Sequence, residues 1–592
     1  MSILLTTSQG VATAPSTQVS GASKPVGRVA AAVEHCGNVA TQLSPPQNTD
    51  EYRSPFQRVG AFRGERPNLA QALVKAPEKV GCVPSDEMVL LSGQAKPASA
   101  SPISIQTLFA LQQTRVDTAA LVLGQLGKDP TALKHISEQL QASCLKDDRA
   151  ATKAELKAAK CLDKDIIELV ASHLQRPGIT SKAVMREAMA AILSARQALI
   201  NGNVWNKVET SFEHNNQRYA CTMIPAAQMK LGDKDIFPVS YRGHGVSSSS
   251  TREIAHATNL WTSEIRAQGH NGQELTLFKG VRHGTLSPYG LEKADEQRHA
   301  GAQNRAREVV AAALFARPEL LRLALAGDVV PLQLVSTSLL TGGFGGEGDM
   351  LNDQIGAWKA LCQARPLVLS LMGGDGKQHT VRVNLEVAAF NFGVNEFALK
   401  FHFGHTQADC HNTIALHQLL GEDLRRSVSP GGWVGEYLNR DPKPANAKRV
   451  ELLSDQLKAV WAAKAHNRDG KEPYKAAQRA AMLAFEIGAV PCWNCKSGKD
   501  RTGMLDVELK REAVALHQNR GLIAPGSRLT KDQQRLLQQA LLHGGNSEVQ
   551  AYNTGAPGNK VMKDVPAFGL SYRSRVGDDE VWNKAQGLSR LV

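Results

Sequence analysis

The stretch NCKSGKDRTG, residues 494 to 503, places one thiol among charged and small residues. Cys495 and Arg501 form a C-x5-R pattern, with Lys496 and Lys499 between them. Basic groups beside a thiol lower its pKa and favour the thiolate, which is the nucleophilic form. A guanidinium six residues further on has a planar fork that can bind two phosphate oxygens. These residue types at this spacing predict a thiolate that attacks phosphorus while the arginine holds the phosphate.

Such a reaction forms a phosphocysteine and also needs a proton donor for the leaving alkoxide. Asp500 lies inside the loop next to Arg501 and is our first candidate for this donor. Thr502 is expected to hydrogen-bond the thiolate or to orient water. The alternative is a basic surface loop with an incidental cysteine, because a C-x5-R pair alone also arises by chance.

The elements around the loop favour the phosphate chemistry. A short apolar segment ends at Val490, and a strong helical pattern begins near Thr502. A Gly/Ser loop between a strand and a helix N-terminus exposes consecutive backbone N–H groups, which form an anion-binding nest that the helix dipole strengthens. We therefore predict a strand, a phosphate-binding loop and a helix, with Ser497 and Gly498 lining the phosphate site.

Three other patterns carry weaker signals. Cys492 and Cys495 make C-x-x-C, but the chain has no second such pair, so Cys492 is predicted to be a buried neighbour or at most a thiol that traps oxidised Cys495. GFGGEG at 343–348 lacks the acidic residue that a dinucleotide site needs, so we expect a mobile loop there. HFGHTQADCH at 402–411 fits no common zinc spacing. We expect no metal and no cofactor.

Length and composition bound the rest of the protein. A chain of 592 residues is too long for one core, so we expect several domains. The net charge of +13 suits an anionic partner, which can be nucleic acid, an acidic membrane face or a phosphorylated small molecule. Nine unpatterned cysteines do not indicate a disulfide scaffold. The N-terminus has no secretory signal peptide pattern, and no run of about 18 apolar residues is present.

The chain divides into three regions by texture. Residues 1–100 are rich in Ser, Thr, Pro, Gly, Ala and Gln and are predicted to be a mostly disordered leader. Residues 101–203 have apolar side chains at helical spacing, which predicts an all-α helical domain. Residues 204–592 alternate strands and helices, which predicts an α/β or α+β domain. Within it we expect a hairpin over 208–226, a polar loop leading into a helix over 245–265, strands over 329–341, 365–372 and 379–394, and helices over 302–327, 471–488 and 502–518.

Two separated blocks carry a family resemblance. CKSGKDRTG (495–503) resembles the signature loop of inositol polyphosphate 4-phosphatases and of the SopB/SigD/IpgD family of bacterial type III-secreted inositol phosphate (phosphoinositide) phosphatases. NFGVNEFAL (391–399) resembles the second block that those proteins share. The segments HATNLWTSE, GVRHGTLSPYG, VSTSLLT and AYNTGAPGNKV resemble the bacterial members. The resemblance is good over residues 200 to 592, looser over 100 to 200, and only compositional before residue 100.

The resemblance implies roles for individual residues. Cys495 would be the nucleophile and Arg501 the phosphate clamp, while Lys496 and Lys499 would engage further phosphates on an inositol ring. Other positions would bind substrate, shape the pocket or brace the loop: Asn391, Asn395, Glu396, Arg282, His283, Lys560 and Lys563. Asn494 stands where classical cysteine phosphatases have a histidine.

By this resemblance the protein is a type III-secreted effector with 4-phosphatase preference toward phosphoinositides and inositol polyphosphates. The helical domain would bind a host Rho-family GTPase (Cdc42-like), and the leader would carry the secretion signal and bind a type III chaperone. The protein would act in the host cytosol, peripheral at host membranes, and not on nucleic acid. Two alternatives stay open: an effector that sequesters the GTPase, with secondary phosphatase activity, and a protein tyrosine phosphatase. Lysines at 496 and 499 favour a substrate more anionic than phosphotyrosine.

Overall fold

The computed structural model describes residues 104–589, with gaps at 132, 134–135, 139–148, 249–255, 270–271, 343–345, 394–403, 468–471, 563 and 566–569. The leader predicted over 1–100 lies outside the described residues, and so do Asn395, Glu396, Lys563 and half of the GFGGEG segment. No helix in the described part of the chain has the length and apolar character needed to cross a membrane.

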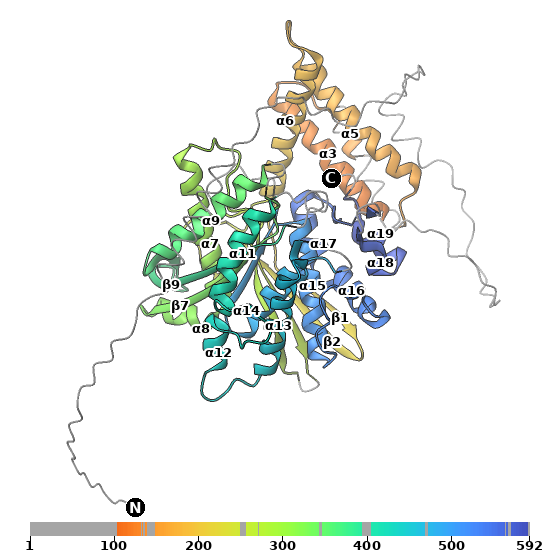
Figure 1. Ribbon diagram of the computed structural model, residues 1–592. Helices are drawn as coiled ribbons and strands as arrows, with labels where there is room; N and C mark the ends of the chain where they lie inside the picture. The colour runs from red at the N-terminus through yellow and green to blue at the C-terminus, as the bar shows by residue number, and fades with distance from the viewer. Residues whose placement is uncertain are drawn as a thin grey trace, which may run out of the picture. The chain divides into compact units, whose positions relative to one another are not determined.

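Three long helices form the N-terminal part of the described chain: α3 (Ile105–Gln125), α5 (Lys153–Leu174) and α6 (Ser181–Gly202) (Figure 1). Each begins after a Ser or Thr whose side chain accepts a first-turn N–H, as helix N-caps commonly do. Their apolar faces pack on one another around buried Val116, Ile166 and Val184. The prediction of helices in this region is confirmed for these segments.

An eight-stranded mixed sheet forms the centre of the remaining chain, in the order β1-β2-β5-β6-β10-β7-β9-β8. The neighbouring strands β1, β2, β5 and β6 are antiparallel to one another. The strand β10 runs parallel to both β6 and β7, β9 is parallel to β7, and β8 is antiparallel to β9. Their bounds are β1 (Val208–His214), β2 (Gln217–Pro225), β5 (Trp261–Gln268), β6 (Glu274–His283), β7 (Val329–Ser338), β8 (Leu367–Met372), β9 (Gln378–Asn391) and β10 (Val490–Asn494). Two short pairs lie apart: β3 (Lys230–Leu231) with β4 (Lys234–Asp235), and β11 (Asp564–Val565) with β12 (Leu570–Ser571).

Four parallel strands end at one edge of this sheet. Asn494 at the end of β10 pairs with His283 of β6 and with Ser338 of β7, and Ser338 pairs with Asn391 of β9. In sheets that contain parallel strands, ligands bind beyond the carboxyl ends of those strands. Cys495 directly follows β10, so the topology alone puts the thiol at this edge.

Helices cover both faces of the sheet, and β10 is buried along its whole length. Val490 and Cys492 join the apolar cluster on one face, whereas Trp493 and Cys495 join the cluster on the other, as expected for alternating strand residues. The first face packs against α7 (Glu296–Ala316), α8 (Pro318–Leu325) and α9 (Glu347–Gln363). The second is covered by α11 (His405–Leu420), α12 (Gly432–Leu438), α13 (Ala447–Ala462), α14 (Lys475–Glu486), α15 (Asp500–His517) and α16 (Lys531–His543), several of which lie in front of the strands in Figure 1. The C-terminal helices are α17 (Asn546–Thr554), α18 (Tyr572–Val576) and α19 (Asp579–Gln586).

The structure confirms most of the predicted elements and corrects two. The strand before the cysteine loop lies later than predicted, because β10 begins at Val490, where the predicted apolar segment ends. The hairpin is β1–β2, and the other three predicted strands are β7, β8 and β9. The helix predicted at the end of 245–265 is wrong, because residues from Trp261 onward form β5 between β2 and β6. The polar Ser263 and Glu264 are tolerated in a central strand because Ser263 Oγ donates to Asp506 at 2.6 Å and Thr276 Oγ1 donates to Glu264 at 2.8 Å.

Candidate active site

The cysteine loop, residues 495–499, connects β10 to α15 as the sequence predicts. Cys495 is almost completely buried, at 1% exposure. The helix begins at Asp500, and no side chain in the described part of the chain caps its N-terminus. First-turn N–H groups of a helix without a capping side chain are free to bind an anion, and the helix dipole favours negative charge there.

Gly498 sets the path of the cysteine loop. Its φ is +65°, in the left-handed region that glycine adopts without strain. A Cβ at this position would lie 2.6 Å from Gly284 N and from His283 O, which is too close for any side chain. The loop therefore packs directly on the backbone that follows β6, and only glycine fits.

The surroundings of the Cys495 thiol favour the thiolate. Burial raises the pKa, but the Arg501 charge and hydrogen bonds from the Thr502 hydroxyl and N–H outweigh it and hold the pKa below its ordinary value. By contrast, burial raises the pKa of Cys492 to about 12, and both cysteines are free thiols. Cys495 is thus the more reactive of the two.

Arg501 is held by a bidentate ion pair that the sequence did not predict. Its Nη2 lies 2.6 Å from Glu347 Oε1, its Nη1 lies 3.0 Å from Glu347 Oε2, and Nη1 also donates to Leu339 O at 2.8 Å. Glu347 is the first residue of α9 and also accepts the Thr341 N–H at 2.7 Å. Burial lowers the pKa of Arg501, but its hydrogen bonds to Glu347 and the nearby negative charges raise it overall. The guanidinium is permanently charged and fixed in orientation.

The two loop lysines occupy different surroundings. Lys496 is partly exposed, with its Nζ 4.7 Å from the centre of the Tyr289 ring, a cation–π arrangement. Lys499 is buried at 5% exposure, and its Nζ lies 3.6 Å from Asp500 Oδ2. One ammonium group is therefore available at the rim of the site and one lies within it.

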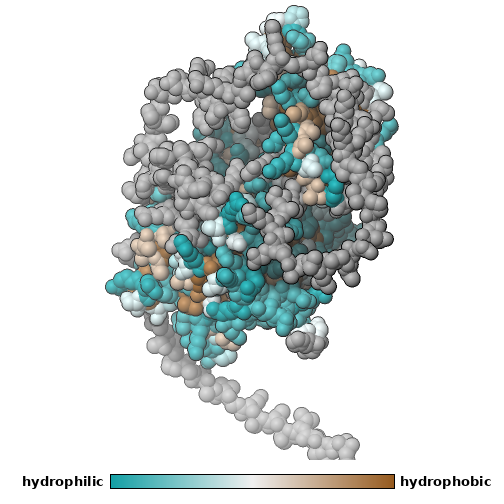
Figure 2. Space-filling view, turned by 90° about the vertical axis from the view of Figure 1, so that its right-hand side faces the viewer, coloured by the Kyte–Doolittle hydropathy of each residue, from teal (hydrophilic) through white to brown (hydrophobic). Residues whose placement is uncertain are grey.

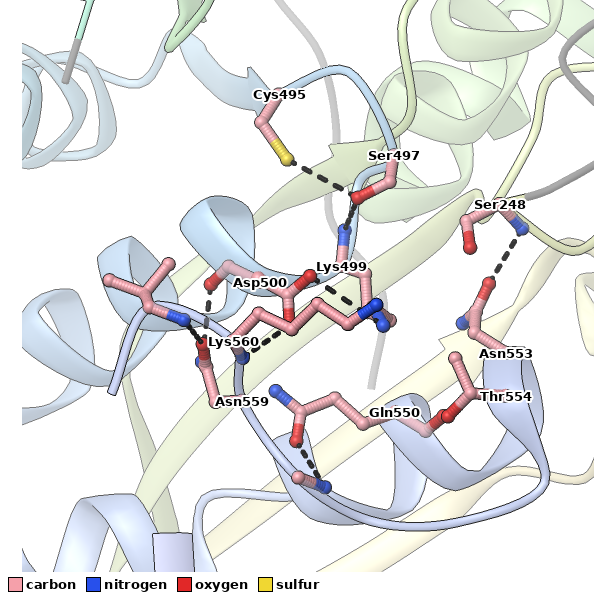
Figure 3. A network of polar contacts seen from close by, with 12 residues as sticks. Ser248, Cys495, Ser497, Lys499, Asp500, Gln550, Asn553, Thr554, Asn559 and Lys560 are labelled. Carbon is pink, nitrogen blue, oxygen red and sulfur yellow. Dashed lines mark hydrogen bonds and ion pairs between the residues drawn. The ribbon is translucent and has the colours of Figure 1, made fainter. Parts of the chain in front are cut away.

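Asp500 connects the cysteine loop to the C-terminal segment (Figure 3). Its Oδ1 accepts the Lys560 N–H at 2.9 Å, and its carbonyl oxygen accepts from Asn559 Nδ2 at 3.2 Å. The Lys560 side chain is exposed. The structure thus brings Lys560 next to the loop.

Arg282 and His283 lie beneath the cysteine loop, where both are fully buried. Arg282 Nη2 donates to Gly498 O at 3.1 Å and to Lys499 O at 3.4 Å, and Nη1 donates to Asn546 Oδ1. His283 Nδ1 donates to Gly284 O at 2.6 Å, and burial lowers its pKa to about 4, so the ring is neutral at physiological pH. Both side chains donate hydrogen bonds to backbone carbonyl groups of this region.

Two further asparagines are structural partners in this region. Asn391 Nδ2 donates to Leu340 O at 2.8 Å, which supports the segment that offers Leu339 O to Arg501. Asn494 exchanges two hydrogen bonds of 2.9 Å with Gln354 of α9. Among the described residues no group of three or more His, Cys, Asp or Glu side chains is arranged to hold a metal ion.

Sequence reasoning missed Glu347, Gln354 and Asn259 as members of this region. Glu347 belongs to GFGGEG, which was noted for its glycine pattern, and Asn259 belongs to HATNLWTSE, which was noted for its family resemblance. Neither pattern indicates a contact with the cysteine loop. Asn259 Nδ2 donates to two carbonyls of the cysteine loop.

A buried thiol with a lowered pKa, an uncapped helix N-terminus and an arginine six residues later are typical of proteins that bind phosphate in a cysteine-containing loop. More specifically, the chain belongs to the family described as enterobacterial virulence protein IpgD, whose family model matches residues 85–592. The family resemblance inferred from the two sequence blocks is confirmed.

Relatives within this family are similar along most of their length. The chain is 48% identical over 499 residues to the inositol phosphate phosphatase SopB of Salmonella typhimurium, covering 83% of this chain and 88% of that protein. It is 40% identical over 491 residues to the inositol phosphate phosphatase IpgD of Shigella flexneri, covering 82% and 88%.

Solved structures share the fold at low sequence identity. A Legionella phosphoinositide phosphatase matches with a TM-score of 0.55 at 11% identity, covering 81% of this chain and 90% of that chain. The Legionella phosphoinositide phosphatase SidF matches with a TM-score of 0.52 at 12% identity, with the same coverage.

Proposed function

We propose that the chain is an inositol phosphate phosphatase that cleaves phosphate monoesters of inositol polyphosphates and phosphoinositides through a phosphocysteine on Cys495. The observation that carries the proposal is the Cys495 thiol, which has a lowered pKa despite burial and precedes an uncapped helix N-terminus. The names of the relatives indicate the same substrate class.

The reaction would proceed in two displacements. The Cys495 thiolate attacks phosphorus, an S–P bond forms, and the P–O bond to the inositol breaks, so the electron pair leaves with the alkoxide. Water then attacks phosphorus, the S–P bond breaks, and inorganic phosphate and the thiolate are released. Arg501 and the loop N–H groups would stabilise the charge on the phosphoryl oxygens in both steps.

Asp500 is our proposed proton donor to the leaving alkoxide in the first displacement. The Lys560 N–H and the Lys499 ammonium both contact its carboxyl group. After the first displacement Asp500 would be a carboxylate, which can accept a proton from the attacking water in the second displacement and so restore the acid.

The distribution of lysines supports a polyphosphorylated substrate. Lys496 at the rim, Lys499 within the site and the exposed Lys560 would bind phosphates that are not being removed. Preference for the 4-phosphate, and the roles of Asn391, Asn395 and Lys563 in shaping the pocket, are proposed by resemblance to the family. Arg282 and His283 would support the loop from below.

The direct test replaces Cys495 by serine in the full chain and measures inorganic phosphate released from a panel of inositol lipids, soluble inositol phosphates and phosphotyrosine peptide. We expect Cys495→Ser to lose at least about a thousandfold in kcat while unfolding at the wild-type temperature, because a neutral hydroxyl is a poor nucleophile.

Cys492→Ser is the matched control, since Cys492 lies three residues away with a raised pKa, and it should keep most of the activity. Normal turnover by Cys495→Ser would refute the assignment of Cys495 as the nucleophile. Release from phosphotyrosine alone would favour the tyrosine phosphatase.

We propose a separate role for each of the three regions of the chain. Residues 1–100 would carry the type III secretion signal and the chaperone site, 101–203 would bind a host Rho-family GTPase (Cdc42-like), and 204–592 would hold the phosphatase at host membranes. The described surface in Figure 2 is mainly hydrophilic with smaller hydrophobic areas. On α6, Met189 and Leu193 are 48% and 59% exposed, which supports a docking face on the helical region.

A charged residue at Leu193 tests the helical region in the full chain. Leu193→Asp should weaken capture of the GTPase at least tenfold and leave phosphate release unchanged, because an exposed apolar contact is lost without disturbing the core. Leu323→Asp on α8, where Leu323 is 48% exposed, is the control. Equal GTPase capture by both variants would contradict this docking face, and a chain that captures the GTPase but releases no phosphate would favour the sequestering effector.

A further inference from the structure

Asn259 lies in the turn that leads into β5, and its side chain is fully buried. Its φ is +49°, in the left-handed region that asparagine adopts more readily than most non-glycine residues. Its N–H donates to Val246 O at 2.7 Å, which fixes the turn. The turn places the side chain against the underside of the cysteine loop.

The Asn259 amide uses all of its hydrogen-bonding capacity. Nδ2 donates to Gly498 O at 2.8 Å and to Ser497 O at 3.3 Å. Oδ1 accepts from Trp261 Nε1 at 2.7 Å and from Asn553 Nδ2 at 2.8 Å. An indole N–H can only donate, so the oxygen must face Trp261 and the NH2 group must face the loop. The orientation of the amide follows from its partners.

These hydrogen bonds control where the loop N–H groups point. In a trans peptide the C=O of one residue and the N–H of the next point in opposite directions. With the carbonyls of Ser497 and Gly498 held on the Asn259 side, the N–H groups of Gly498 and Lys499 face the other way. The Lys499 N–H points toward Ser497 Oγ at 3.3 Å, and that hydroxyl lies 3.8 Å from Cys495 Sγ (Figure 3). The Asn259 side of the loop and the thiol side are therefore opposite.

We propose that Asn259 is a positioning residue of the phosphatase: it holds two peptide planes of the cysteine loop so that their N–H groups face the phosphate bound over Cys495. The inference rests on the proposed function and deepens it, because it assigns the geometry of the anion nest to one side chain outside the C-x5-R segment.

Arg282 also holds the backbone of the cysteine loop, but it contacts only some of the same carbonyl groups as Asn259. It donates to Gly498 O and Lys499 O, whereas Ser497 O accepts from Asn259. Asn259 is in turn held by Asn553 of α17, whose Oδ1 accepts the Ser248 N–H at 2.8 Å. Figure 3 shows Asn553 and Ser248 facing each other beside the loop. The positioning side chain is thus built into the packing of α17 on the sheet edge.

The test is Asn259→Gly in the full chain, because glycine keeps the left-handed backbone and removes only the amide. The expected result is a 10- to 100-fold lower kcat on a soluble inositol polyphosphate, in line with the loss of one well-placed donor. Inorganic phosphate should protect Cys495 from iodoacetamide with about tenfold lower affinity, and the pH midpoint of alkylation should move upward.

Asn519→Gly is the matched control, since Asn519 has a φ of +56° but lies exposed just beyond the far end of α15. It should behave as wild type in all three measurements. If Asn259→Gly does not fold, Asn259→Asp keeps the shape and the acceptor for Trp261 and should give the same three changes.

Wild-type phosphate protection and an unchanged alkylation midpoint in a folded Asn259 variant would overturn the proposal. Phosphate protection and alkylation are measured without turnover, so they test Asn259 even when no inositol phosphate is hydrolysed. A wild-type chain that binds phosphate but hydrolyses no inositol phosphate would refute the proposed function alone.

Discussion

The ion pair with Glu347 both orients Arg501 and partly neutralises its charge, and replacing Glu347 by glutamine would separate these two effects. The carboxylate makes hydrogen bonds of 2.6 and 3.0 Å to the guanidinium, and an amide can accept only one of them. A charge-assisted hydrogen bond contributes about 1.5–3 kcal/mol, and roughly 1.4 kcal/mol corresponds to a factor of ten in rate. Loss of one such contact, with the remaining NH2 repelled by the guanidinium, should lower kcat/KM by about 10- to 100-fold.

The same substitution should lower the pKa of Cys495, whereas a simple loss of structure around the thiol would raise it. Arg501 lowers the pKa of Cys495, and Glu347 partly neutralises that arginine. Without the carboxylate the positive potential at the thiol rises, so the folded-state pKa of Cys495 falls further. Alkylation of Cys495 by iodoacetamide across pH measures this directly, and its midpoint should move to lower pH while turnover falls.

Glu451→Gln is the control for this experiment, because Glu451 pairs with Lys443 on the surface at 3.2 Å and lies outside the site. It should change neither turnover nor the alkylation midpoint. The reasoning would be refuted if Glu347→Gln turned over within threefold of wild type, or if its alkylation midpoint rose with a normal unfolding temperature.

Two further predictions concern the loop and the helix behind it. Gly498→Ala should lower activity at least about 100-fold and the free energy of unfolding by about 1–3 kcal/mol, because its Cβ would meet backbone atoms at 2.6 Å. The control is Gly521→Ala, which has a φ of +69° and no described atom within 4 Å of its Cβ, so it should show only the mild backbone cost. Equal effects of the two substitutions in activity and denaturant assays would contradict the close-packing argument. Glu508 is buried, which raises its pKa, but Arg575 and Arg511 outweigh burial and lower the pKa from 4.5 to about 2. A depressed folded-state pKa stabilises the protein above the unfolded value, so this stabilisation, on the order of 3 kcal/mol, should be complete above about pH 4.5 and be lost as the pH falls toward 2. Urea unfolding between pH 7 and 2.5 should show that slope in the wild type and a flatter one in Glu508→Gln, and equal slopes would contradict the assignment.

Local signals in the sequence were enough to predict the centre of the site. Cys495 and Arg501 are six residues apart, and a strong helical pattern follows them, so a loop that leads into a helix follows from one short segment. The strand was expected too early, because the predicted apolar segment ends at Val490, where β10 begins. The helix begins at Asp500, two residues before the predicted start near Thr502, as helix ends commonly differ. The β1–β2 hairpin was equally local, with Asn215 and Asn216 in the left-handed region at its turn.

The rest of the site depends on contacts between distant segments, which residue patterns do not encode. Glu347 meets Arg501 across 154 residues, and Asn259 meets Gly498 across 239. The strand order places these segments together, and that order was not predictable. The strands β5 and β6 were missed because they lie in the middle of the sheet, where partners such as Asp506 satisfy polar side chains that would otherwise suggest a loop or helix.

The contacts of the C-terminal segment with the loop and its helix have a consequence for the order of assembly. Lys560 reaches Asp500 from 60 residues downstream, and Arg575 reaches Glu508 from 67 residues downstream. During synthesis on the ribosome, the cysteine loop emerges well before either partner. The nascent chain therefore cannot complete these contacts until residues 560 to 575 have left the ribosome, and a stop codon before residue 560 would remove them while leaving the C-x5-R segment intact.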